Sequence, residues 1–177
     1  TQAWALHKFD LDEYIGDYVR VQFGTYNDGW GGVTAMYVDD ASFEASAAGR
    51  EVTFEAGEMC RILGWPNLVR SALDNVIRNA IRHTPDGTTI DVALDVGSEQ
   101  TVVTVRDHGP GVPGEHLDSL FEPFTRVAEA RDRSTGGAGL GLAITRRAVE
   151  IHGGTVSASN HPDGGLVVTI RLPLARP

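Results

Sequence analysis

The stretch "LDNVIRNAIRHTP", residues 73–85, has the pattern of a helix and places Asn75 and Asn79 four residues apart within it. Arg82 follows three residues later, so all three side chains share one helix face. Asparagine is a mediocre helix former, and a buried carboxamide without a partner costs about 1–3 kcal/mol. By itself the pair also fits an ordinary solvated face. Two further segments of the chain help to decide whether this face is a solvated surface or part of a binding site.

The rest of the pattern predicts one mixed α/β domain. An apolar stripe runs along the same helix, which ends before Pro85. Alternation of apolar and polar residues predicts strands at 50–56, 89–96, 100–109, 155–160 and 164–173, with a second short one at 60–65. Further helices are expected at 9–19, within 113–124, and from 139 to Gly153. The polar, glycine-containing segment 125–138 is expected to be a mobile loop.

Composition limits the class of protein. The 177 residues are 41% hydrophobic and 22% charged, as in ordinary globular domains. A net charge of −9 and a pI near 5.0 argue against a general nucleic-acid or anionic-membrane binder. The single cysteine, Cys60, rules out an internal disulfide and is interpreted as a small buried residue. The sequence shows no signal peptide or membrane span, so the chain is expected to be cytoplasmic.

Two glycine-containing segments add chemistry to the helix. In "DHGPGVP", residues 107–113, Asp107 comes at the end of a strand, where a carboxylate can accept hydrogen bonds from an exocyclic amine. The glycines of this segment allow backbone to approach a ligand. In "GGAGLGLAI", residues 136–144, glycine-rich backbone runs into a helix N-terminus, which is an arrangement that binds phosphate.

The order of these segments resembles the GHKL superfamily of ATP-binding domains, and in detail the catalytic domain of sensor histidine kinases. "DNVIRNAIRHTP" is similar to the N box, "DHGPGVP" to the G1 box, "FEPFTR" (121–126) to the F box and "GGAGLGLAI" to the G2 box. The resemblance covers about residues 50–173. It implies a Bergerat fold, an α/β two-layer sandwich with a mixed, mostly antiparallel sheet packed on three main helices. A flexible ATP lid would cover the site.

The resemblance implies roles for the polar helix face. Asn79 matches the asparagine that binds Mg²⁺, and Asn75 is its companion facing the phosphates. Arg82 stands where the family usually has a lysine against phosphate, so the charge is kept but the geometry differs. His83 replaces an aromatic residue that lies beside the nucleotide. Arg126 matches an arginine that reaches the γ-phosphate in some members.

The resemblance also implies how ATP is held elsewhere. Asp107 matches the aspartate that reads the adenine amino group. The remaining nucleotide-binding positions are loop residues, namely Gly109 and Gly111 in the G1 box, Phe124 in the F box, and Gly137, Gly139, Leu140 and Gly141 in the G2 box. For the two phenylalanines of the F box, Phe121 and Phe124, anchoring of the lid is an equally good interpretation.

Residue 75 favours phosphoryl transfer over hydrolysis. Gyrase-like members of the superfamily, which hydrolyse ATP, carry a general-base glutamate one helical turn before the Mg²⁺ asparagine, whereas Asn75 cannot accept a proton near neutral pH. The function expected is donation of the γ-phosphate of ATP to a histidine in two-component signal transduction. The alternatives are a GHKL ATPase, a serine-kinase or anti-sigma relative, or an engineered ATP-binding scaffold.

None of the six histidines lies in a phosphoacceptor motif. The expected partners are therefore a separate histidine-containing dimerisation domain and a response regulator, with no nucleic acid and no direct membrane contact. The parent protein is expected to be anchored in the inner membrane of a bacterium.

The N-terminal part departs from the family pattern. Residues 1–19 are interpreted as a linker remnant and the start of a first helix, 20–38 as an atypical insertion, and 39–177 as the remainder of the catalytic domain. The insertion is rich in glycine and aromatic residues, a composition that also resembles a binding loop. A solvent-facing hairpin without function is the simpler interpretation.

Overall fold

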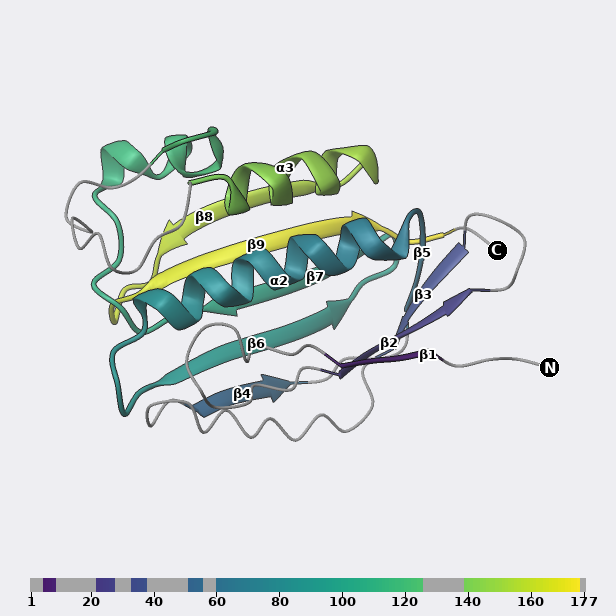
Figure 1. The fold of residues 1–177 in the computed structure, drawn as a ribbon, viewed down its shortest axis with the longest axis horizontal. Coiled ribbons are helices and arrows are strands. Elements are labelled where there is room, and N and C mark those ends of the chain that lie inside the picture. Colours follow the sequence, from purple (N-terminus) through teal and green to yellow (C-terminus); the bar gives the residue numbers. More distant parts are fainter. Residues whose placement is uncertain are drawn as a thin grey trace.

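A five-stranded sheet with two α-helices against one face forms the body of the molecule (Figure 1). The computed structural model describes residues 5–8, 22–27, 33–37, 51–55, 60–125 and 139–175. Strand order is β4-β6-β7-β9-β8, with β4 parallel to β6 and the other neighbours antiparallel. The strands are β4 Glu51–Glu55, β6 Thr89–Val96, β7 Gln100–Arg106, β8 Thr155–Asn160 and β9 Leu166–Pro173. The predicted mixed, mostly antiparallel sheet is confirmed.

Helix α2, Pro66–His83, is the helix that carries the two asparagines. Proline in its first turn costs no backbone hydrogen bond. The helix ends because Pro85 forces the preceding Thr84 out of helical geometry, to φ −77° and ψ 125°. Its buried face consists of Val69, Ala72, Leu73, Val76, Ile77, Ala80 and Ile81.

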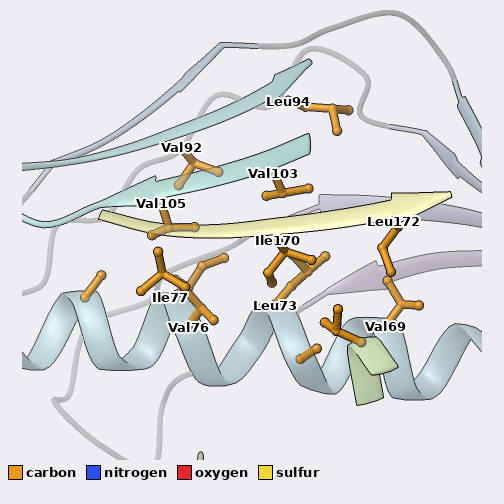
Figure 2. Close-up of a cluster of buried hydrophobic side chains, with 14 of the residues drawn as sticks. Val69, Leu73, Val76, Ile77, Val92, Leu94, Val103, Val105, Ile170 and Leu172 are labelled. Atoms are coloured by element: carbon orange, nitrogen blue, oxygen red, sulfur yellow. The ribbon is translucent and has the colours of Figure 1, made fainter. Parts of the chain in front are cut away.

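The core lies between α2, helix α3 (Gly141–Ile151) and the inner face of the sheet. Alternate residues of each central strand point into it, as Figure 2 shows for Val92, Val103 and Ile170. Burial in β9 alternates along the strand, so its outer face carries partly exposed residues. The end of β7 and the start of β9 lie beside the C-terminus of α2, where the candidate site begins.

A second, four-stranded sheet contains β1 (Ala5–Lys8), β2 (Gln22–Asn27), β3 (Val33–Tyr37) and β5 (Cys60–Leu63) in that order, all antiparallel. Strands β2 and β3, which pair with each other, lie within the 20–38 stretch that was interpreted as an atypical insertion. The short strand expected at 60–65 is β5, and it pairs with β3. The helix expected at 9–19 lies outside the described residues.

Two expected elements differ in detail. The short helix expected within 113–124 consists of two 3₁₀ turns, Gly114–His116 and Asp118–Phe121, because the segment between Pro113 and Pro123 is short and tight 3₁₀ turns suit such short stretches. Strand β7 ends at Arg106, one residue before Asp107. Of the expected lid, 125–138, only Thr125 is described. No helix of the described ranges is long and apolar enough to cross a membrane.

Candidate functional site

The polar face of α2 carries two half-buried carboxamides. Asn75 and Asn79 are both half-buried, and Arg82, further along the same face, is exposed. Among the described residues, neither asparagine side chain has a hydrogen-bond partner. The carboxamide donors and acceptors on this face are thus not used by the other described residues, and they could bind a ligand.

The start of α3 meets this face at Asn75. A Cβ atom placed on Gly141 would lie 3.5 Å from Asn75 Oδ1. The buried hydroxyl of Thr145 hydrogen-bonds Ala72 O of α2, 3.0 Å away, and lies 3.1 Å from Gly141 O. Within the described residues, no side chain caps the N-terminus of α3. The first N–H groups of α3 are therefore oriented beside Asn75, where an anion could accept their hydrogen bonds.

Asp107 lies in the turn after β7, beside the C-terminal end of α2. It is 3% exposed, and its Oδ1 accepts hydrogen bonds from the N–H groups of Gly109 (2.9 Å) and Leu166 (3.0 Å). Its backbone N–H donates to Leu166 O at 3.0 Å. These contacts fix the carboxyl plane. Within the described ranges the second oxygen, Oδ2, has no partner, so it can accept a hydrogen bond from a ligand.

His83 joins the helix to this turn. Its carbonyl oxygen lies so close to Gly109 that a Cβ atom there would overlap it. Desolvation by the surrounding protein lowers the pKa of His83 below its usual value, although the residue as a whole is exposed, and the carboxylate of Asp107 opposes this shift. The imidazole is therefore expected to be neutral at pH 7.

Gly165 is a contact that the sequence motifs did not indicate. It has φ +90°, is buried, and a Cβ atom there would overlap the carbonyl oxygen of Asp107. Its neighbour Gly164 has a similar φ of +95°, but the nearest atom to a Cβ there is 4.0 Å away. An alanine at Gly164 would therefore test backbone strain alone, whereas an alanine at Gly165 would test strain together with crowding against Asp107.

This difference predicts unequal effects of the same substitution. Gly164→Ala should cost about 1–3 kcal/mol of unfolding free energy, as an unfavourable φ does. Gly165→Ala should cost roughly 1–3 kcal/mol more, because the carbonyl of Asp107 must move. Urea unfolding of the two variants measures both values. Equal losses would contradict the predicted crowding.

Asn160, at the end of β8, is a second residue that no motif indicated. Its Oδ1 accepts from Val112 N at 2.9 Å, and its Nδ2 donates to Val112 O at 2.7 Å. Only the fold brings it there, since an isolated asparagine at a strand end has no distinctive spacing. It holds the end of the same turn that starts at Asp107.

The two F-box phenylalanines have different surroundings. Phe121 is 6% exposed and belongs to the core, whereas Phe124 is 73% exposed with φ 65°. The N–H of Phe124 donates to Gly139 O at 3.0 Å, and Arg146 of α3 pairs with Glu122 at 2.9 Å. Phe121 is thus the residue that anchors this segment to the core. Two other predicted site residues, Arg126 and Gly137, lie outside the described residues.

The predicted positions fall into three groups. Asn75 meets Gly141 and the adjoining Leu140 at the start of α3, His83 and Gly109 meet beside Asp107, and Phe124 meets Gly139. Gly111, with φ +74°, belongs to the second group through Asn160. Asn79 and Arg82 lie on α2 between the first two groups. The third group adjoins the first, because Gly139 directly precedes Leu140 in the chain.

The oxygen atoms that this site offers would suit Mg²⁺ only if a bound phosphate supplied further oxygens. In the ranges that the structure describes, no group of three or more His, Cys, Asp or Glu residues could hold a metal ion. The amide oxygen of Asn79 is a hard neutral ligand of the kind Mg²⁺ accepts. Because Mg²⁺ commonly combines one or two protein ligands with phosphate oxygens and water, the residues fit a metal that arrives with a phosphate ligand.

Comparisons with known proteins agree with one another. Residues 65–176 match the family described as histidine kinase-, DNA gyrase B-, and HSP90-like ATPase. The sensor histidine kinase CpxA of Escherichia coli (strain K12) is 45% identical over 139 residues, 77% of this chain and 30% of CpxA. The chain thus spans about 30% of that relative's length.

Solved structures show the same likeness. A solved structure of the mycobacterial sensor histidine kinase MprB superposes with a TM-score of 0.63 at 30% identity, covering 72% of this chain and 84% of the solved chain. The ATP binding domain of PrrB from Mycobacterium tuberculosis gives a TM-score of 0.58 at 29% identity, covering 72% and 82% of the two chains.

Proposed function

The chain belongs to the histidine kinase-, DNA gyrase B- and HSP90-like ATPase family, and we propose that it is the ATP·Mg²⁺-binding catalytic domain of a sensor histidine kinase. In this proposal it donates the γ-phosphate to a histidine on a separate dimerisation domain. One observation carries the proposal. The polar face of α2 connects the Asp107 turn at its C-terminal end to the N-terminus of α3 at Asn75. These contacts are about 12 Å apart along the helix, a span comparable to a nucleoside triphosphate.

The Asp107 end is proposed to bind adenine. With Oδ1 occupied by two N–H donors, Oδ2 is the oxygen that can accept from the 6-amino group. Gly109 and Gly111 let the turn pack closely against His83 and Asn160, and the backbone of this turn would lie beside the base. Neutral His83 lies beside the carboxylate and would cover the nucleoside without adding charge.

The Asn75 end is proposed to bind the phosphates. The N-terminus of α3, which no described side chain caps, would supply N–H groups, and Asn75 would supply an amide beside Gly141. Arg82 would contribute positive charge, with Arg126 as a second candidate. Asn79 would be the protein ligand of Mg²⁺. When bound, the ion neutralises phosphate charge and orients the γ-phosphoryl group.

The same residues favour phosphoryl transfer to a protein over hydrolysis. Position 75 holds an amide that cannot act as a general base, so no group there would activate water. The comparison proteins support this, since CpxA, BaeS, WalK and CusS are all named as histidine kinases or sensor histidine kinases. The remaining parts of the proposal concern the longer protein: a dimerisation domain, a response regulator, and a membrane-anchored parent with this domain in the cytoplasm.

Base selectivity tests the proposed site. We expect ATP·Mg²⁺ to bind with micromolar affinity and GTP·Mg²⁺ at least roughly 100-fold more weakly, because guanine presents a carbonyl where adenine presents an amine. Isothermal titration with each nucleotide measures the two dissociation constants. Asp107→Asn keeps the shape of the side chain but adds an N–H donor, so it should reduce the difference between the dissociation constants for ATP and GTP. Equal affinity of the unmodified protein for ATP and GTP would rule out Asp107 as the adenine reader.

A further inference from the structure

We propose that Asn160 is a positioning residue for the base-binding turn: it holds the backbone of Val112 and so fixes the turn from Asp107 to Val112 before nucleotide arrives. The inference rests on the proposed function, because it concerns the same nucleotide site. It assigns a role to a residue 48 positions away from Val112 in the sequence. Neither the sequence motifs nor the family resemblance pointed to it.

The contact is made by both ends of one carboxamide. Oδ1 accepts from Val112 N at 2.9 Å, and Nδ2 donates to Val112 O at 2.7 Å. Asn160 thus satisfies the donor and the acceptor of one residue, as a neighbouring strand would. The preceding Gly111 has φ +74°, and a Cβ atom there would lie 2.8 Å from Asn160 Oδ1. Glycine at 111 is therefore required for this close approach.

The two ends of the turn are tied to the same hairpin. At its start, Asp107 Oδ1 accepts from the N–H of Leu166, the first residue of β9. At its end, Val112 is held by Asn160, the last residue of β8. Asn160 and Leu166 are directly paired across the hairpin. The β8–β9 hairpin therefore clamps the turn at both ends.

Such a clamp is expected to act on affinity more than on stability. A turn that is already ordered loses little conformational freedom when ligand binds, which favours binding. Asn160 is exposed and lies outside the hydrophobic core, so its loss should leave the core unchanged. The consequence of removing it should appear where the turn meets the base.

The test compares Asn160→Ala with Asn160→Asp and with the control Ser159→Ala. Ser159 is the exposed neighbour on β8 and makes no side-chain hydrogen bond within the described residues. Asn160→Ala should weaken ATP·Mg²⁺ binding roughly tenfold, as expected for two lost hydrogen bonds. Asn160→Asp keeps the acceptor for Val112 N–H but turns a carboxylate oxygen toward Val112 O, so its affinity should fall at least as far as that of Asn160→Ala. Ser159→Ala should bind as the unmodified protein does.

Two further measurements separate positioning from general damage. The amide of Val112 should exchange with solvent faster in Asn160→Ala, while core amides of β7 keep their protection. The melting temperature of both Asn160 variants should stay close to that of Ser159→Ala. Unchanged ATP affinity in Asn160→Ala would overturn the inference, as would loss of the melting transition in both Asn160 variants. If the unmodified protein bound no ATP, the proposed function itself would fail instead.

Discussion

The Asn79→Ala variant is expected to lose the magnesium-dependent part of ATP binding while keeping its fold. Asn79 is half-buried and its carboxamide has no partner among the described residues, so little native structure depends on it. Alanine is also the better helix former. If Asn79 is the protein ligand of Mg²⁺, its removal should weaken ATP·Mg²⁺ binding at least tenfold, which corresponds to about 1.4 kcal/mol.

The measurement compares dissociation constants with magnesium and with a chelator present. In chelator the variant and the unmodified protein should bind ATP equally weakly, because the missing contact is to the metal. Asn67→Ala is the matched control, since Asn67 is an exposed asparagine near the start of the same helix. It should behave as the unmodified protein in both conditions. An unchanged magnesium effect in Asn79→Ala would mean that the polar face of α2 has a structural role.

The purified chain is expected not to phosphorylate itself and to hydrolyse ATP only very slowly. Phosphoryl transfer requires a nucleophile in line with the γ-phosphorus, and none of the six histidines has an acceptor motif. The structure adds a reason for one of them. His152 is 7% exposed, and both of its ring nitrogens are used: Nε2 accepts a hydrogen bond from Trp65 N–H, and Nδ1 donates to Ala148 O.

Incubation with γ-labelled ATP measures this directly. The chain alone should take up no acid-labile label, whereas adding the histidine-containing dimerisation domain of the parent protein should label that domain. Asn79→Ala should remove the label again, and Asn67→Ala should leave it. Acid-labile label on the chain alone, traced to one of its own histidines, would contradict the proposed division of roles between two domains.

The sequence by itself determined the family, the fold class and the helix that carries the polar face. These features are local or periodic. The stripe of α2 follows from helical spacing, its end follows from Pro85, and the order of the glycine-containing segments identified the family. Strands β6, β7, β8 and β9 were predicted from alternation, and their pairing agrees with the antiparallel sheet that the resemblance implied. The roles of individual site residues stay predictions until they are tested.

Tertiary structure alone decided which residues hold the site in shape. Asp107 accepts a hydrogen bond from Leu166, 59 positions away, and Val112 is bonded to Asn160, 48 positions away. Such contacts depend on strand register and on which residues end the β8–β9 hairpin, and neither leaves a local pattern. The same holds for Gly165, which resembles any turn glycine until the carbonyl of Asp107 is placed against it. Local periodicity specifies elements, whereas the shape of a binding turn is set by side chains and backbone that only the completed sheet brings together.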